Sequence, residues 1–229
     1  MKFFIDFLSL LYPEICPICG NALLVGEKIL CTVCFYKLPK AKYHLDPHNP
    51  VQELFSGRAN ISHAATFLKF SKGGMVQKLI HEFKYKNKKE IGFFLGEVYA
   101  NELMQTDWIK SIDYLIPIPL HPLKLKKRGF NQSEEFAKGL SNVLNIPVRT
   151  DLLSRIKFSE TQTKKSKYKR WENVKDIFEA PNYAALANKH ILLVDDVITT
   201  GATIEAASQH LLQIENVKLS VAAIAYAAI

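Results

Sequence analysis

Long apolar runs, internal repeats and low-complexity tracts are absent from this sequence, and the chain of 229 residues holds four cysteines. Nothing in it approaches the roughly 20 apolar residues that span a bilayer, so we expect no stable membrane insertion. A composition that is 48% hydrophobic can still supply a sizeable core, and the length suits one α/β domain with a small appendage. We therefore expect a soluble, cytoplasmic protein.

The N-terminus, residues 1–13, is apolar after a lysine and superficially resembles a secretion signal. Asp6 interrupts the run, and no small-residue cleavage site follows it. Its apolar residues fall instead on one helical face: Phe4, Phe7, Leu8 and Leu11. We expect a short amphipathic helix that packs on the protein, with membrane attachment as the alternative.

The four cysteines form two C-x-x-C pairs, Cys16 with Cys19 and Cys31 with Cys34, separated by eleven residues. Each pair places two thiolates on one knuckle, and two knuckles close a tetrahedral site that suits zinc or iron. Because four thiolates leave no position open for a substrate, we expect structural zinc. Two disulfides or a thiol-redox pair are the alternatives, and the missing signal sequence counts against the disulfides.

The stretch 37–58 is rich in proline and has no clear periodicity. It predicts a boundary between an N-terminal helix, zinc ribbon and linker at residues 1–58 and an α/β domain at residues 59–229. Three histidines near this boundary are interpreted as ordinary surface or loop residues, because the cysteines already complete the metal site: His44, His48 and His63.

The stretch 191–203 combines an apolar run, the two acids Asp195 and Asp196, and a Thr-Thr-Gly turn that opens a helical pattern. Gly201 lets the backbone approach a ligand, and the hydroxyls and free N–H groups at the helix start can donate to phosphate oxygens. Two carboxylates beside such a cradle suit a phosphorylated sugar, with Mg²⁺ offsetting the remaining charge. An ordinary turn with a capping threonine is the alternative.

This stretch resembles the loop of type I phosphoribosyltransferases that binds 5-phosphoribosyl 1-pyrophosphate (PRPP), in which apolar residues, two acids and T-[TS]-G-x-T follow one another. The resemblance implies that Asp195 and Asp196 carry catalysis by holding the ribose 2′- and 3′-hydroxyls. It also implies that the following turn holds the 5′-phosphate, through Thr199, Thr200, Gly201, Ala202 and Thr203.

Strand and helix patterns alternate through the second part of the chain. Expected strands cover 64–70, 113–119, 191–194 and 217–226, and expected helices cover 75–83, 90–104, a segment ending near 144, and 202–212. This alternation predicts a mostly parallel central sheet flanked by helices. We expect an α/β fold of the type I phosphoribosyltransferase class with a small N-terminal four-cysteine zinc ribbon.

The net charge of +8 favours a polyanionic partner, and the basic residues gather in three windows: 69–89, 124–128 and 157–175. The middle window follows the second expected strand and predicts a loop that can wrap a pyrophosphate at the carboxyl edge of the sheet. A charged surface turn is the alternative. Candidate PRPP contacts in this stretch are His121, Arg128, Asn131 and Gln132.

The two outer windows combine positive charge with aromatic residues, which predicts a groove for single-stranded DNA; a solvated helix face is the alternative for 69–89. The window 157–175 lacks an apolar period and is interpreted as a mobile loop that closes over a sugar phosphate, with a disordered linker as the alternative. Candidate DNA contacts are Lys84, Lys86, Lys164, Lys165, Lys167, Lys169 and Arg170.

Four further motifs follow one another along the chain: Pro117 to His121 (PIPLH), Arg128 to Gln132 (RGFNQ), Thr161 to Thr163 (TQT) and Arg170 to Val174 (RWENV). With the cysteine pairs and the acidic turn, they resemble the ComF family of competence-associated proteins over nearly the whole chain. Residues 159–163 depart from the proline-rich form expected there. The resemblance implies a role in DNA uptake and natural transformation, with competence helicase and DNA-processing proteins as partners.

Two classes of function stay open. In an enzyme, a nitrogen nucleophile attacks Mg²⁺-bound PRPP and pyrophosphate leaves, as in nucleobase salvage, while the protein works by positioning and charge stabilisation. In a binding module, the pocket holds PRPP or a nucleotide and the protein handles single-stranded DNA. An acceptor pocket would separate the two classes, and the sequence does not show one.

Overall fold

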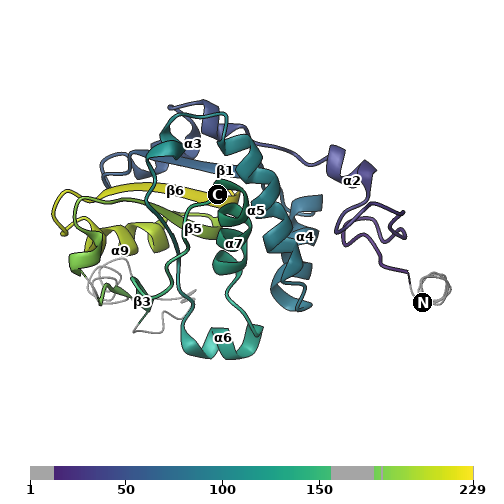
Figure 1. Ribbon diagram of the computed structural model, residues 1–229. Coiled ribbons are helices and arrows are strands. Elements are labelled where there is room, and N and C mark those ends of the chain that lie inside the picture. Colours follow the sequence, from purple (N-terminus) through teal and green to yellow (C-terminus); the bar gives the residue numbers. More distant parts are fainter. Residues whose placement is uncertain (1–12, 156–177, 182, 229) are drawn as a thin grey trace.

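The computed structural model describes residues 13–155, 178–181 and 183–228. Its centre is a sheet of four parallel strands in the order β1-β6-β5-β2 (Figure 1): β1 (His63–Lys69), β2 (Tyr114–Pro117), β5 (His190–Ile198) and β6 (Lys218–Tyr226). Two short strands pair antiparallel outside this sheet: β3 (Ser154–Arg155) and β4 (Phe178–Glu179). The parallel sheet confirms the expected fold class.

Helices cover both faces of the sheet. Their bounds are α2 (Thr32–Tyr36), α3 (Pro50–Phe55), α4 (Met75–Tyr85), α5 (Glu90–Leu103), α6 (Pro122–Arg128), α7 (Gln132–Leu144) and α9 (Ala202–Leu211). Three 3-10 turns lie at Tyr43–Leu45, Trp108–Ser111 and Tyr183–Leu186. Among the described residues, no helix has both the length and the apolar character needed to cross a membrane.

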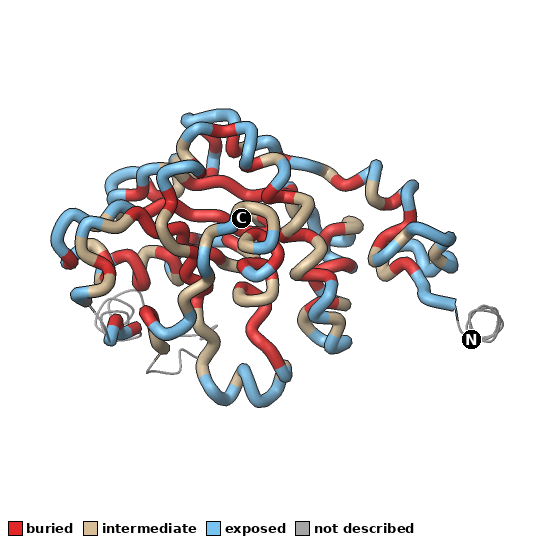
Figure 2. Tube along the Cα trace, in the orientation of Figure 1, coloured by how far each residue is buried: buried red, intermediate tan, exposed pale blue. Residues whose placement is uncertain are grey.

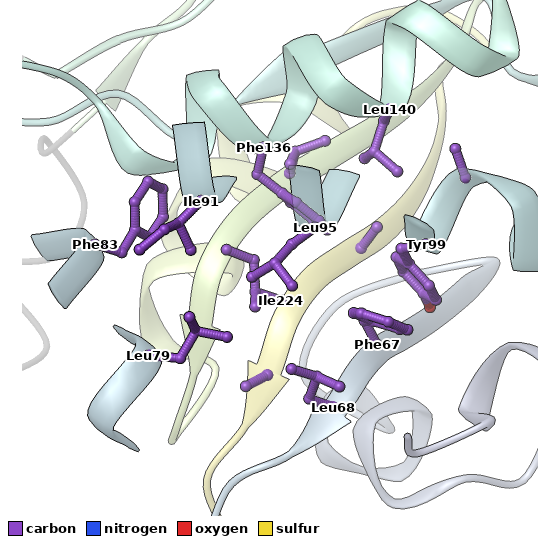
Figure 3. Close-up of a cluster of buried hydrophobic side chains, with 14 of the residues drawn as sticks. Phe67, Leu68, Leu79, Phe83, Ile91, Leu95, Tyr99, Phe136, Leu140 and Ile224 are labelled. Carbon is purple, nitrogen blue, oxygen red and sulfur yellow. The ribbon is translucent and has the colours of Figure 1, made fainter. Parts of the chain in front are cut away.

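Two apolar cores sandwich the sheet, because the side chains of each buried strand alternate between its faces. On β5, Leu192 and Val194 point into the core under α4, α5 and α7, whereas Ile191 and Leu193 point into the core under α3 and α9. Figure 3 shows the first core, with Leu95, Phe136 and other side chains over the strands. Figure 2 shows the buried trace concentrated along the strands and their covering helices.

Close contact between α5 and α7 depends on two glycines. A Cβ atom at Gly139 would lie 2.0 Å from the carbonyl oxygen of Phe93, and one at Gly96 would lie 2.4 Å from that of Phe136. Real Cβ atoms do not approach backbone atoms so closely, so a side chain at either position would force the helices apart. This packing holds α7, whose first turn borders the acidic pair, against the sheet.

The stretch 37–58 is more ordered than its proline content indicates. Asn49 caps α3 by accepting hydrogen bonds from the backbone N–H groups of Val51 and Gln52, and Pro50 occupies the first turn, where its missing N–H costs nothing. Val51 and Phe55 are fully buried in the core beneath α9. Residues of the expected linker therefore pack as part of the α/β layer, and a domain boundary at residue 58 stays a prediction.

Two further expectations need correction. Most of the predicted basic loop after β2 is helical, because His121 caps α6, Pro122 starts it and Gly129 ends it with a φ of 81°. His44 is a buried side chain, 7% exposed, and not a surface residue. The expected N-terminal helix and the basic segment 157–175 lie outside the described residues.

Candidate functional site

The two acids Asp195 and Asp196 lie toward the carboxyl end of β5, beside the end of β2, where Pro117 pairs with Val194. The chain leaves these neighbouring strands in opposite directions: after β5 it enters α9 on one face, and after β2 it reaches α7 on the other. Such a divergence opens a crevice at the carboxyl edge of a parallel sheet, and ligands commonly bind there.

The carboxylate of Asp195 is held from two sides. Its Oδ1 accepts hydrogen bonds from the Ser133 hydroxyl at 3.1 Å and from the backbone N–H of Asp196 at 2.8 Å. Burial, and then the neighbouring charge of Asp196, raise the pKa of Asp195 to about 7, although these hydrogen bonds and Lys84 oppose the rise. The site therefore holds a carboxyl group that changes charge near neutral pH.

Asp196 is 9% exposed and pairs with a cation from α4. Lys84 Nζ, at the end of α4, lies 2.8 Å from Asp196 Oδ2, and both side chains are largely buried. The other oxygen, Oδ1, accepts from the backbone N–H of Val197 at 2.6 Å. The sequence placed Lys84 among the candidate DNA contacts, but the structure puts its ammonium group against the acidic pair.

Further cations surround the two acids. Burial lowers the pKa of Lys124, with the charges of Arg155, Arg128 and Lys84 adding to the effect and Asp196 opposing it. Burial likewise lowers the pKa of Arg155, and Asp195 opposes that shift. Arg155 comes from β3 and stacks its guanidinium 5.4 Å from the Phe178 ring. This concentration of positive charge around two acids suits a ligand that carries both hydroxyls and phosphates.

The Thr-Thr-Gly turn after β5 lines a hollow of about 30 Å³ together with the first turn of α9. Gly201 has a φ of 73°, and a Cβ there would lie 2.9 Å from Phe55, so both conformation and space require glycine. Arg58 fixes the turn from outside: its Nη1 donates to the Thr200 carbonyl oxygen at 2.9 Å, and its Nη2 pairs with Glu205. The exposed hydroxyl of Thr200 accepts a long hydrogen bond of 3.4 Å from the Ala202 N–H.

The predicted contacts between β2 and α7 make mainly structural interactions in this state. His121 Nδ1 accepts from the backbone N–H of Leu123, and Arg128 donates to Gln132 Oε1 at 2.9 Å. Asn131 Nδ2 donates to the Ile118 carbonyl oxygen at 3.0 Å, and its Oδ1 caps α7 through the N–H of Ser133. These bonds hold the first turn of α7 against the acids, while ligand contacts by the predicted residues stay predictions.

The four cysteines converge as the spacing predicts. Their Sγ atoms all lie within 4.8 Å of one another, and the Sγ atoms of Cys19 and Cys31 are 3.7 Å apart. A tetrahedron with zinc–sulfur bonds of about 2.3 Å has sulfur atoms about 3.8 Å apart, so this cluster can hold a metal ion such as zinc. Three of the four side chains, Cys16, Cys31 and Cys34, are buried, which suits a structural site.

The structure describes only some of the candidate DNA contacts. Lys86 caps the C-terminus of α4, two residues beyond the paired Lys84. Five others lie outside the described residues: Lys164, Lys165, Lys167, Lys169 and Arg170. The basic last turn of α6 is exposed at Lys126 and Lys127, next to the carboxyl edge of the sheet.

Comparison with known proteins places the same region in a known family. Residues 131–228, which include the first turn of α7 and the acidic turn, match the phosphoribosyl transferase domain. Competence protein F of Haemophilus influenzae is 32% identical over 57% of this chain and 59% of its own length. DNA utilization protein YhgH of Escherichia coli K12 is 28% identical over 87% and 84%, and competence protein ComFC of Bacillus subtilis is 27% identical over 83% and 81%.

The chain is therefore similar to ComF-like proteins, and its residues 131–228 match the phosphoribosyl transferase domain. The match to the Haemophilus protein spans less than two thirds of that protein's length. The matches to YhgH and ComFC each cover more than four fifths of this chain and of the relative.

Sequence reasoning missed three residues that the fold brings to the acids or to the turn: Lys84 as an ion-pair partner, Arg155 and Arg58. Each lies at least 40 residues from Asp195 in the chain and belongs to no local motif. The one sequence signal for Lys84 was its place in a basic, aromatic segment, which did not indicate its partner.

Proposed function

We propose that the ComF-like chain binds PRPP with Mg²⁺ at the carboxyl edge of the sheet and acts in the handling of DNA during uptake. The observation that carries the proposal is the pairing of Asp195 and Asp196 with a cradling turn inside a crevice rich in cations. Polyphosphates need cations, and ribose hydroxyls need acceptors; this crevice offers both.

Each group has a role in this proposal. The carboxylates of Asp195 and Asp196 accept hydrogen bonds from the ribose hydroxyls, and the turn from Thr199 to Thr203 donates to the 5′-phosphate. Mg²⁺, when bound with PRPP, offsets negative charge on the pyrophosphate. His121, Arg128, Asn131 and Gln132 stand beside the crevice as the proposed pyrophosphate contacts, through side chains that at present bond to protein groups.

Sugar hydroxyls that bind Asp196 compete with Lys84, because Nζ of Lys84 lies 2.8 Å from Oδ2 of Asp196. A lysine side chain is flexible enough to turn toward a phosphate when a ligand arrives. Lys84 then positions Asp196 in the free protein and contributes charge to the bound state. Its role in single-stranded DNA binding is secondary in this proposal.

The role in DNA uptake rests on the relatives named competence protein F, ComFC and DNA utilization protein. The proposed DNA ligand is single-stranded and binds through Lys86 and the basic segment 157–175. Its affinity should fall as the salt concentration rises, as is typical of phosphate contacts. Competence helicase and DNA-processing proteins are the proposed partners. The cysteine cluster is proposed to hold one structural zinc ion.

Calorimetry of PRPP binding with and without Mg²⁺ tests the proposal. Asp195→Asn with Asp196→Asn removes two charged acceptors, and each such hydrogen bond is worth about 1.5–3 kcal/mol, so we expect at least a tenfold loss of affinity per residue. Asp107→Asn, at an exposed carboxylate outside the crevice, is the matched control and retains wild-type affinity. Equal affinity in the double variant would reduce the acidic stretch to an ordinary turn.

Isotope-traced turnover of PRPP separates an enzyme from a binding module. Pyrophosphate release that depends on one acceptor, either a nucleobase or single-stranded DNA, identifies a phosphoribosyltransferase and names its acceptor. Binding without turnover over the whole set of acceptors identifies a PRPP-responsive DNA-handling protein.

A further inference from the structure

Ser133 links the first turn of α7 to the acidic pair. It is the second residue of α7 and is buried, with 3% of its surface exposed. Its hydroxyl donates to Oδ1 of Asp195 at 3.1 Å, although the two residues lie 62 positions apart in the chain. Among the described residues, this is the one hydrogen bond that another side chain makes to Asp195.

A closed ring of hydrogen bonds holds Ser133 in place. The Ile118 N–H, just after β2, donates to the Val194 carbonyl oxygen at 2.8 Å, and the Ile118 carbonyl oxygen accepts from Asn131 Nδ2 at 3.0 Å. Asn131 Oδ1 in turn accepts from the Ser133 N–H at 3.1 Å. The Ser133 hydroxyl closes the ring on Asp195, which follows Val194 in β5. Because these bonds connect β2, α7 and β5, they fix the position of Ser133 relative to Asp195.

The two carboxylate oxygens of Asp195 differ in their surroundings. Oδ1 accepts from the Ser133 hydroxyl and, at 2.8 Å, from the Asp196 N–H, so both of its lone pairs are used. Oδ2 has no hydrogen-bond donor among the described residues, and it is not one of their buried unpaired atoms. It is therefore open to solvent, at a residue that also lines the hollow of the Thr-Thr-Gly turn. A donor group of a ligand can reach Asp195 through Oδ2.

We propose that Ser133 is a positioning residue for Asp195. By holding Oδ1, it keeps the carboxylate in one orientation and leaves Oδ2 for a hydroxyl group of the ligand. This role rests on the proposed binding of PRPP, whose ribose carries such hydroxyls. Ser133 itself contacts no ligand and acts through Asp195.

Ser133 also favours the charged form of Asp195. Burial, and then the charge of Asp196, raise the pKa of Asp195 to about 7, while the Ser133 hydroxyl is one of the groups that oppose the rise. A hydrogen bond to an ionised acceptor is stronger than one to a neutral acceptor, so removing the hydroxyl should raise the pKa of Asp195 further. Because the proposed PRPP site uses the ionised carboxylate, the loss of affinity should be greatest near neutral pH.

Ser133→Ala removes this hydroxyl and leaves the backbone bond to Asn131 in place. Calorimetry with PRPP and Mg²⁺ from about pH 5.5 to about pH 9 measures the effect. We expect binding about tenfold weaker near pH 7, the effect of one hydrogen bond to a charged group, and a pH midpoint of affinity that moves upward. Near pH 9 a loss of up to about threefold should remain, because the freed side chain can occupy about three staggered χ1 wells.

Carbon NMR of the side-chain carboxyl groups in the ligand-free protein gives a second readout. The titration midpoint of Asp195 should move upward in Ser133→Ala, and this measurement does not depend on PRPP. If Ser133 served packing alone, its replacement would leave that midpoint unchanged.

Two comparisons separate positioning from folding. Ser141→Ala makes the same change near the end of α7, away from the acids, and should leave PRPP affinity and the Asp195 midpoint as in the wild type. Ser133→Ala in the Asp195→Asn background should cause no pH-dependent loss, because the titrating carboxyl group is gone. A loosened helix would instead weaken binding equally in both backgrounds.

An upward shift of both midpoints in Ser133→Ala, absent from Ser141→Ala, supports the proposal. An unchanged midpoint in either measurement, or the same loss at every pH in both backgrounds, overturns it. Absence of PRPP binding in the wild type overturns the proposed function and the positioning role with it. Normal wild-type binding that Ser133→Ala leaves unaltered overturns the positioning role alone.

Discussion

Replacing Asp195 by asparagine is expected to stabilise the protein while it weakens PRPP binding about tenfold or more. The pKa of Asp195 is raised from its ordinary value of 3.8 to about 7, because burial and the charge of Asp196 penalise its ionised form. Asparagine has the same shape, carries no charge and still accepts through Oδ1 from Ser133 and from the backbone N–H of Asp196. The variant therefore keeps the contacts and loses the penalty.

The sign and size of the effect follow from linkage. Below pH 3.8 the carboxyl is protonated in both the folded and the unfolded chain, and the substitution changes little. Between pH 3.8 and about 7 the folded protein holds the proton and the unfolded chain does not, so wild-type stability falls as pH rises. The stability difference therefore grows across this window to at most about 4 kcal/mol and is constant above it.

Chemical denaturation of both proteins at a series of pH values between 4 and 8 measures this difference. Asp113→Asn is a control of opposite sign: although burial opposes it, hydrogen bonds from the His190 N–H and from Lys189 lower the pKa of Asp113. That variant should be less stable than the wild type by an amount that stays constant above pH 3.8, because Asp113 is then ionised in both the folded and the unfolded chain. A gain for Asp195→Asn that does not depend on pH, or a loss at pH 8, would refute the reasoning.

Three further predictions concern Lys84, the cysteine cluster and the contact between α5 and α7. Lys84→Met should raise the pKa of Asp195 further, since Lys84 is among the groups that lower it. Because PRPP binding needs the ionised carboxylate, wild-type PRPP affinity should rise with pH through about 7, and the variant's affinity should rise at a higher pH. Calorimetry over a pH series measures this shift. Cys31→Ser should abolish zinc binding in metal analysis while circular dichroism of the α/β domain is retained, because a structural site needs all four thiolates. Gly139→Ala should cost about 1–3 kcal/mol in a denaturant melt, because its Cβ would meet the Phe93 carbonyl oxygen at 2.0 Å.

The sequence alone predicted most helices and strands and the two most specific motifs, the cysteine pairs and the acidic turn. The apolar periods set α4, α5, α7, β5 and β6 to within a few residues, because the periods of helix and strand are properties of neighbouring residues. The cysteine spacing predicted a cluster that the structure closes, and the sequence of acids, threonines and glycine predicted the turn before α9.

Tertiary structure decided which distant groups meet the acids. Lys84, Arg155 and Arg58 reach Asp196, Asp195 and the Thr200 carbonyl from separate elements, because the sheet order and the diverging connections at its carboxyl edge bring them there. Burial in the folded protein, followed by the charge of Asp196, raises the pKa of Asp195 against the opposing charge of Lys84, and this burial has no counterpart in the linear chain.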